Sequence, residues 1–277
     1  MWTERQQAML REIGVRVWSA PLPAALPPST GASATVAERV SSPVPSVAAV
    51  AARLLPAPPA LPAPASVRAP PASPAMRGDV AALDWQALRT AVADCRACAL
   101  CESRTQPVFG AGHEQAHWMV VGEAPGEQED LQGEPFVGPS GQLLDRMLAA
   151  LQLTRAADGP EPPSQRVYIA NTLKCRPPRN RNPTPQEMAQ CEPFLQRQIE
   201  LLRPRLILAM GRFAVQALLR SDEPIGKLRG RVHRYHGVPL VVTYHPAYLL
   251  RNLPDKAKAW ADLCLAAQVA RERQAGA

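Results

Sequence analysis

The sequence predicts an α/β fold, a three-layer αβα sandwich around a parallel sheet of about four strands. Four short runs are continuously apolar, which is typical of strands buried on both faces of a sheet. A segment whose apolar residues recur at helical spacing follows each run. Strands that alternate with helices in this way form parallel sheets covered on both faces.

The first strand is expected at residues 119–121, directly after Trp118. A loop rich in glycine and carboxylates, residues 122–130, then forces a turn, so Glu123 and Asp130 lie beyond the carboxyl end of this strand. Open α/β sheets build their binding sites at that edge. The other elements are expected as a helix at 142–153, a strand at 167–170, a helix at 185–202, a strand at 206–210, a helix at 213–219, a strand at 239–242 and a helix at 255–271.

The N-terminal part of the chain has a different composition. Residues 21–75 hold 14 of the 31 prolines, four charged residues and no aromatic residue. Such a segment cannot bury enough apolar surface to offset the entropy of ordering. We therefore expect a disordered Pro/Ala-rich linker at 21–78 and a folded domain at 79–277.

Residues 1–20 form a short amphipathic segment ahead of the linker. It is too short to be a stable helix alone. The sequence leaves two interpretations open: the segment folds back on the domain, or it is a tethered peptide for the groove of a partner protein. No apolar run approaches the length of a membrane span and charges interrupt any signal-peptide core, so a cytoplasmic protein is expected.

The net charge is +7, and the excess gathers in two loops. One loop carries Arg176, Arg179 and Arg181, and the other spans residues 227–234. Both loops flank the candidate site and contain proline or glycine instead of helix-forming residues. They indicate a nucleic acid as the partner.

Five of the six cysteines indicate a metal centre. Cys95, Cys98 and Cys101 follow one another at CxxC spacing, and Cys175 and Cys191 come later. In a cytoplasmic chain such spacing indicates metal instead of disulfides. Zinc and a cubane iron–sulfur cluster both accept four thiolates, and the spacing does not choose between them. Cys264 stands alone in a helical pattern and is expected in the core.

Four motifs together resemble one known family. Residues 122–130, 133–141, 171–178 and 244–248 resemble, in identity, order and spacing, the family 4 uracil-DNA glycosylases, the iron–sulfur branch of that superfamily. The resemblance covers about residues 85–265. It implies a uracil-DNA glycosylase-like fold and a monomeric DNA repair hydrolase. Such an enzyme flips uracil out of double- or single-stranded DNA and hydrolyses its N-glycosidic bond, leaving an abasic site.

The resemblance also implies a 4Fe-4S cluster. Cys95, Cys98, Cys175 and Cys191 match the ligand positions of the family. Cys101 is an extra thiol that could replace Cys98, so the identity of that one ligand stays open. The cluster is expected to be structural.

The reaction implied by the resemblance leaves negative charge on the departing base. His245 matches the histidine that donates a hydrogen bond to uracil O2, and Asn171 matches the asparagine that pairs with O4 and N3–H. Phe136 resembles the aromatic residue that stacks on the flipped base. Glu129 matches the carboxylate that lies against uracil C5 and excludes the methyl group of thymine. Ala124 stands where family 1 enzymes carry an aspartate.

The residue that positions water is harder to assign. Glu123 is the nearest carboxylate that remains, and Asn180 is a second candidate by resemblance. Flipping a base also requires a wedge and a grip on phosphates. The candidates for DNA binding are Ser140 at the start of a helix, Arg229 in the second basic loop, Leu249 as part of an apolar wedge and Arg251 as a backbone contact.

Two other functions compete with excision in the sequence. One is an iron–sulfur protein that captures uracil in DNA without turnover, as covalent relatives do. Those relatives carry an inserted basic loop with a histidine after the cysteine motif, and residues 176–185 contain no histidine. The other is a non-catalytic scaffold for nucleic acid or a partner protein.

Overall fold

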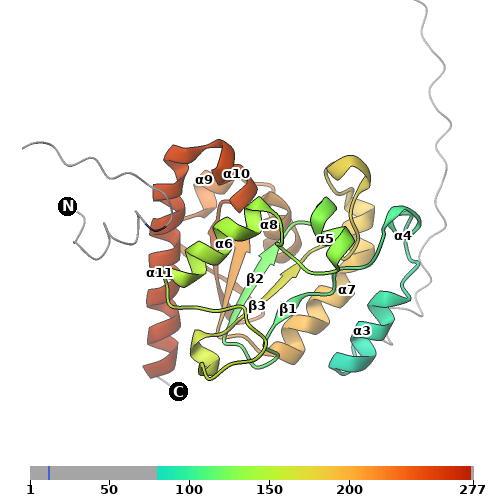
Figure 1. Cartoon of the computed structure of the whole chain (residues 1–277). Helices are drawn as coiled ribbons and strands as arrows, with labels where there is room; N and C mark the ends of the chain where they lie inside the picture. The colour runs from blue at the N-terminus through green and yellow to red at the C-terminus, as the bar shows by residue number, and fades with distance from the viewer. Residues whose placement is uncertain (1–11, 13–79, 276–277) are drawn as a thin grey trace, which may run out of the picture. The chain divides into compact units, whose positions relative to one another are not determined.

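The computed structural model describes residue 12 and residues 80–275 (Figure 1). The predictions for the amphipathic segment 1–20 (apart from Glu12) and for the linker 21–78 lie outside these residues. Within the described part, no helix has both the length and the apolar character that a bilayer crossing requires.

A six-stranded sheet forms the centre of the domain, in the order β1-β3-β2-β4-β6-β5. The four inner strands run parallel, as predicted: β3 (Val167–Asn171), β2 (Trp118–Gly122), β4 (Leu206–Met210) and β6 (Val238–Thr243). All residues of β2, β3 and β4 are buried, which explains their unbroken apolar sequences. The carboxyl ends of these strands meet at one edge of the sheet.

Two antiparallel edge strands were not predicted. β1 (Ala111–Gly112) pairs with β3, and β5 (Val232–Tyr235) pairs with β6. β5 reaches β6 through His236 and Gly237, whose φ angles are 45° and 83°. Positive φ at both residues suits the tight hairpin turn that matches the twist of the strands.

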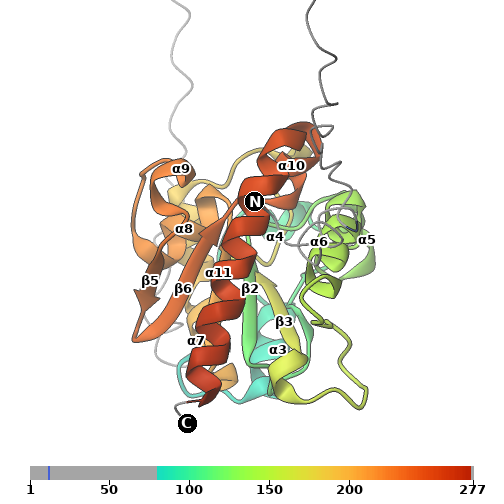
Figure 2. The ribbon, with the colours of Figure 1, turned by 90° about the vertical axis from the view of Figure 1, so that its left-hand side faces the viewer.

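Helices cover both faces of the sheet (Figure 1, Figure 2). Successive residues of a strand point to opposite faces, so Val120 packs into one core and Val121 into the other. The first core contains residues of α6 (Pro139–Ala149), α10 (Pro246–Arg251) and α11 (Lys256–Ala275); the second contains residues of α7 (Pro185–Leu202), α8 (Arg212–Leu219) and α9 (Ile225–Leu228). The predicted αβα sandwich is therefore confirmed.

A third core lies around the cysteines. It joins α3 (Trp85–Ala93) and α4 (Leu100–Ser103) to Phe194 of α7 and to Leu173 in the segment after β3. The remaining elements are the helix α5 (Glu127–Gln132) and the 3₁₀ turns η1 (Pro163–Gln165), η2 (Pro178–Asn180) and η3 (Leu253–Asp255).

Local signals explain most helix boundaries. Thr184 and Glu187 form a capping box at the start of α7, and Pro185 occupies its first turn. α6 begins at Pro139, earlier than predicted, and ends at Ala149 before Gln152 adopts a φ of 61°. The acidic loop after β2 is also more ordered than predicted, because residues 127–132 form α5.

Candidate active site

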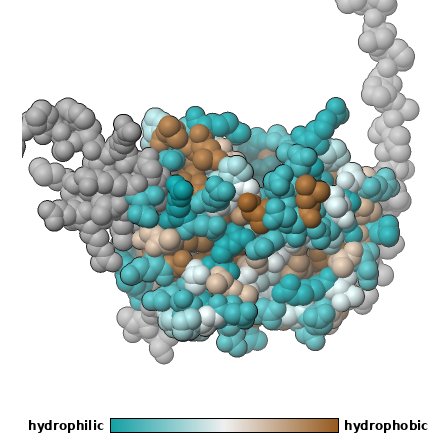
Figure 3. Space-filling view, viewed as in Figure 1, coloured by the Kyte–Doolittle hydropathy of each residue, from teal (hydrophilic) through white to brown (hydrophobic). Residues whose placement is uncertain are grey.

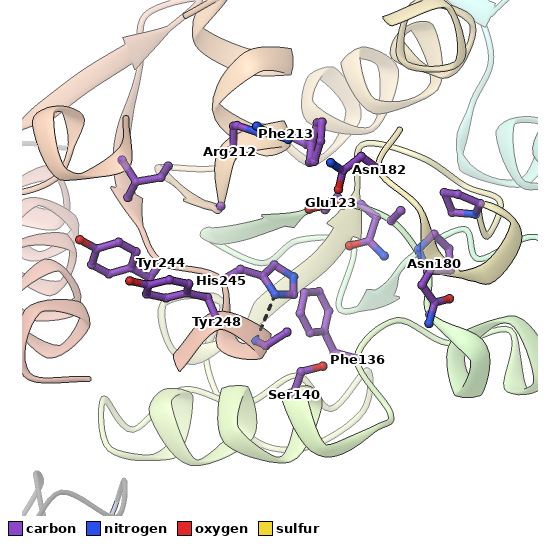
Figure 4. Close-up of a pocket in the computed structure, with 18 of the residues that line it drawn as sticks. Glu123, Phe136, Ser140, Asn180, Asn182, Arg212, Phe213, Tyr244, His245 and Tyr248 are labelled. Atoms are coloured by element: carbon purple, nitrogen blue, oxygen red, sulfur yellow. Dashed lines mark hydrogen bonds between the residues drawn. The ribbon is translucent and has the colours of Figure 1, made fainter. Parts of the chain in front are cut away.

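A cleft of about 840 Å³ opens at the carboxyl ends of the parallel strands (Figure 4). Each inner strand contributes to it: the loop after β2 supplies Glu123, the end of β3 supplies Asn171, Arg212 follows β4 and His245 follows β6. All predicted catalytic and uracil-binding residues line this cleft. The topology of the sheet thus gathers residues that lie more than 100 positions apart in the sequence.

Asn171 presents an unpaired acceptor to the cleft. The residue is 2% exposed, and its Oδ1 has no hydrogen-bond partner among the described residues. A buried polar atom without a partner is unusual in a folded protein. Gly122 makes the space beside it, because a Cβ at position 122 would overlap Asn171 Oδ1 and the ring of Phe136. The Oδ1 of Asn171 is therefore available to a ligand.

Phe136 lies beside the imidazole of His245, with ring centroids 5.4 Å apart and an interplanar angle of 29° (Figure 4). Its φ of 56° is uncommon for a bulky side chain, and such backbone conformations persist only where neighbouring groups enforce them. Arg155 does so by donating to the carbonyl groups of Pro135 and Phe136 at 2.7 and 2.9 Å. Gly141 also allows the Phe136 backbone to approach α6 closely.

Glu129 joins two backbone segments beside the cleft. One carboxylate oxygen accepts from Gly126 N at 3.1 Å, and the other accepts from Val137 N and Gly138 N at 3.0 and 3.1 Å. The side chain lines the cleft but is only 9% exposed. Glu129 therefore anchors the backbone around Phe136, whatever contact it makes with a bound base.

His245 caps the N-terminus of α10, and its Nδ1 accepts a hydrogen bond from Ala247 N at 3.2 Å (Figure 4). In a neutral ring whose Nδ1 is an acceptor, the proton resides on Nε2. Burial lowers the pKa of His245 to about 4; Glu129 opposes this shift and Arg251 reinforces it. The imidazole is therefore a neutral donor at physiological pH.

Glu123 and Asn180 line the same cleft. Burial raises the pKa of the Glu123 carboxyl group, and the nearby charge of Arg212 opposes this shift. Asn180 has a φ of 54°, and its Oδ1 accepts from Arg176 Nε at 2.8 Å.

Two of the predicted DNA contacts need correction. Arg229 forms an ion pair with buried Asp262 at 2.9 Å and donates to Lys258 O at 2.5 Å, so its guanidinium holds α11 instead of being free for a phosphate. Leu249 is 1% exposed and packs in the first core, whereas Leu250 is 42% exposed. The orientation of α10 about its own axis therefore buries Leu249, which is not exposed as a wedge for the DNA stack would have to be.

The other two predicted contacts, Ser140 and Arg251, line the cleft. Exposed Leu250 and Leu253 accompany Arg251 near the end of α10, and Figure 3 shows hydrophobic surface at that end of the molecule. Arg155 and Arg212 were missed by the sequence interpretation. Arg212 directly follows Gly211 at the end of β4, so the strand-end rule that identified the other residues also applies to it.

Five cysteines line one small cavity: Cys95, Cys98, Cys101, Cys175 and Cys191. Cys264 lies apart, half-buried against the first core. Both Cys98 and Cys101 reach the cavity, so the choice between them remains open. Among the described residues, no three metal-binding side chains converge on a single point suited to one ion; the thiols instead surround the cavity.

The chemistry of the cavity fits an anionic thiolate centre. Arg104 donates from Nη1 to Cys175 Sγ at 3.0 Å, and the backbone N of Lys174 donates to Cys191 Sγ at 3.4 Å. Lys174 also lines the cavity; burial lowers the pKa of its ammonium group to about 8, and the nearby Cys191 and Cys175 oppose this shift. Hydrogen bonds and cations of this kind stabilise clustered thiolates. In the protein alone, burial raises the pKa of Cys191 to about 12, so its deprotonation depends on a bound cation.

Comparison with known proteins identifies the family. Residues 109–264 match the model of the uracil DNA glycosylase superfamily. The chain is 42% identical over 167 residues to the type-4 uracil-DNA glycosylase of Archaeoglobus fulgidus, an alignment that covers 57% of this chain and 79% of that protein. It is likewise 42% identical over 163 residues to the type-4 uracil-DNA glycosylase of Thermotoga maritima, covering 58% and 80% of the two chains. The type-5 uracil-DNA glycosylase of Pyrobaculum aerophilum is 34% identical over 157 residues, covering 53% and 68%. With this sheet, this cleft and these cysteines, the chain belongs to the uracil DNA glycosylase superfamily, within its type-4 group.

Proposed function

We propose that this chain removes uracil from DNA by hydrolysis of the N-glycosidic bond, releasing free uracil and leaving an abasic site for base excision repair. The similarity to type-4 uracil-DNA glycosylases supports the reaction. The observation that carries the assignment of the site is the unpaired Oδ1 of Asn171, which shares a cleft with a neutral imidazole donor and an aromatic ring.

Asn171 reads the edge of the base. Its Oδ1 accepts from uracil N3–H and its Nδ2 donates to O4, whereas cytosine presents an acceptor and a donor at these two positions. Because the site is buried, the wrong base leaves polar groups unpaired, which discriminates strongly. Phe136 stacks on the base, and Glu129 holds the loop that carries Phe136 while its carboxylate faces uracil C5.

His245 stabilises the leaving group. As the bond between C1′ and N1 breaks, its electron pair moves to the base and negative charge grows on O2. The Nε2–H of His245 donates to that oxygen without transferring a proton, because a neutral donor that is already oriented in a dry site stabilises developing charge. The hydrogen bond from Ala247 N fixes this orientation.

Glu123 and Asn180 orient the water that attacks C1′. The oxygen of the water forms the new bond to C1′ as the bond to N1 breaks; the carboxylate of Glu123 accepts the proton that the water loses, and the uracil anion takes up a proton when it leaves the site. The raised pKa of Glu123 suits a carboxylate beside a pocket that also excludes bulk water. Its charge also accompanies the positive sugar. The small side chain of Ala124 leaves room for the water.

The DNA is held at the rim of the cleft. Ser140, at the start of α6, and exposed Arg251 contact the phosphates. Exposed Leu250, and not Leu249, enters the space that the flipped base vacates.

A 4Fe-4S cluster occupies the cysteine cavity in this proposal. Cys95, Cys175 and Cys191 are three of its ligands, and Cys98 or Cys101 is the fourth. When bound, the cluster supplies four thiolate–iron bonds that tie the segment after α3 to the segment after β3 and to α7. Its role is structural.

The direct test is a single-turnover assay on an oligonucleotide with one uracil, followed by cleavage at abasic sites. We expect excision from this substrate and none from matched oligonucleotides with thymine or cytosine. An Asn171→Ala variant that retains abasic-site binding should excise uracil much more slowly than the wild type. Tight binding of uracil-containing DNA without release of uracil would instead support a base-capturing protein.

A further inference from the structure

Lys174 is a charged residue whose burial the reaction above does not explain. Its side chain is 1% exposed, and it lies between the cysteine cavity and the end of β3. An ammonium group is seldom buried so completely unless opposite charge and hydrogen bonds compensate for the lost water. The contacts of this residue therefore indicate a specific role.

The contacts of Lys174 join the two functional centres of the domain. On one side, its Nζ donates to the backbone carbonyl of Asn171 at 2.9 Å. On the other side, its backbone N donates to Cys191 Sγ at 3.4 Å, and the next residue is Cys175. A single residue thus touches both the asparagine that reads the base and the wall of the cysteine cavity.

Gln198 holds the far side of the ammonium group. Its Oε1 accepts from Lys174 Nζ at 2.7 Å, and the glutamine itself is fully buried in α7. Its Nε2 donates to Phe109 O at 2.9 Å and lies 3.3 Å from the hydroxyl group of Tyr168. These bonds fix both the amide orientation of Gln198 and the position of the lysine.

The carbonyl that Lys174 contacts controls the direction of the Asn171 side chain. Asn171 is the last residue of β3, where the regular pairing with β2 ends at Gly122. Beyond that pair, Thr172 N and Leu173 N still donate to Gly122 O and Glu123 O at 3.1 Å, and Lys174 and Cys175 follow. The position of the Asn171 peptide group sets the direction of its Cα–Cβ bond, and so the position of the unpaired Oδ1.

We propose that Lys174 is a positioning residue: its ammonium group, held by Gln198, fixes the backbone of Asn171 and so aims the Asn171 amide at the uracil edge, while its backbone N–H donates to Cys191 in the cysteine centre. This inference rests on the proposed function, because it assigns to Asn171 the task of reading uracil. It makes base recognition dependent on the cysteine centre through one residue.

The test is a double-mutant cycle in the full-length chain, purified anaerobically with its cluster. We expect Lys174→Met to lower single-turnover excision about a hundredfold, the loss that a displacement of about 1 Å produces at a reacting site. In an Asn171→Ala background the same change should cost less than about twofold, because effects that act through one group are not additive. In an Arg251→Ala background, which removes a proposed phosphate contact and leaves Lys174 and Asn171 in place, the full loss should remain.

Two further readouts separate positioning from cluster retention. Iron and acid-labile sulfide per chain, and affinity for abasic-site DNA, should match the wild type in Lys174→Met. A loss of iron in proportion to the loss of activity, or an equal loss in the Asn171→Ala background, would overturn the proposal. If Lys174→Met is insoluble, Gln198→Met removes one of the acceptors of Nζ and must show the same dependence on Asn171.

The outcome also separates this inference from the function on which it rests. A wild-type protein that does not release uracil refutes both. A wild-type protein that releases uracil, combined with losses that multiply in the cycle, refutes only the role of Lys174.

Discussion

Gly122→Ala is the substitution that tests the geometry of the base pocket most directly. Gly122 ends β2, and its φ is not in the left-handed region, so alanine fits the backbone. The added methyl group would instead lie 2.6 Å from Phe136 Cζ and 2.9 Å from Phe136 Cε2, and would also overlap Asn171 Oδ1. The change therefore acts on the two side chains that hold the base and on little else.

The size of the effect follows from these distances. Real Cβ contacts are essentially never shorter than 3.0 Å and rarely shorter than 3.4 Å, so the Phe136 ring must move by about 0.4–0.8 Å. Displacements near 1 Å at a reacting site cost about a hundredfold in rate. Overpacking a core typically costs about 1–3 kcal/mol of stability. We expect a 30- to 100-fold loss of excision, of the order set by that displacement, in a protein that stays folded.

The assay is single-turnover excision of uracil at saturating enzyme and fixed salt, with urea denaturation of the same samples. Gly226→Ala is the matched control, because Gly226 lies on the wall of the same cleft and an added methyl group meets nothing within 4 Å. Its rate should equal that of the wild type. Unchanged excision by Gly122→Ala would show that Phe136 and Asn171 do not form the pocket for the base.

Four other predictions concern the same site and the cysteines. Burial holds the pKa of His245 near 4, well below its usual value of about 6.5, so His245 should cause no step near pH 6.5 in the pH profile of excision. Near that pH, the profiles of the wild type and of His245→Asn should therefore have the same shape. The lowered pKa also makes the stability of the fold depend on pH, because His245 takes up a proton below pH 6.5 in the unfolded chain but only near pH 4 in the folded chain. The free energy of unfolding of the wild type, measured relative to that of His245→Asn, should therefore be highest above pH 6.5 and should decline toward pH 4. Asn171→Asp should lower uracil excision and admit cytosine, since a carboxylate accepts from the amino group of cytosine but cannot donate to uracil O4; a variant still selective for uracil would contradict this pairing. Protein purified anaerobically should be brown, with about four iron and four sulfide ions per chain. Cys95→Ala and Cys191→Ala should be unstable. If one of the variants Cys98→Ala and Cys101→Ala retains iron, the cysteine replaced in that variant is not a ligand. Leu250→Ala should slow excision from duplex more than from single-stranded DNA, whereas Leu249→Ala, a core truncation, should lower stability by about 2–5 kcal/mol; the reverse pattern would mean that α10 rotates on DNA.

The sequence predicted the centre of the sheet well because burial on both faces leaves a clear pattern. β4 was predicted with the bounds that the structure shows, and so was α7, whose capping residues Thr184 and Pro185 are local signals. The edge strands were missed for the opposite reason. β1 has two residues, and β5 alternates between exposed and half-buried side chains at the end of a basic loop. Neither segment carries a run of apolar residues from which a strand can be recognised.

The site residues divide in the same way. Residues beyond strand ends were predictable because parallel strands bring these positions to one edge, and the motifs named the residues. The errors arose where a role depends on a partner distant in sequence or on helix rotation. Arg229 was expected on DNA, but its partner Asp262 lies 33 residues later. Leu249 and Leu250 are neighbours, and only the packing of α10 decides which of them is buried.

Each group that would contact the base has its own backbone anchor, and this explains how a cleft built from loops can be specific. Glu129 holds the loop of Phe136, the Ala247 amide holds His245, and Lys174 holds Asn171. Loops at a sheet edge lose discrimination unless their polar groups are oriented before the ligand arrives, because orienting them later consumes binding energy. The anchors use different elements and share no hydrogen bond among the described residues, but the Phe136 ring lies against the His245 imidazole, so the contacts made by these two residues are coupled. Damage to the anchor of Asn171 should therefore impair its contact with uracil while the contacts of Phe136 and His245 and the fold persist.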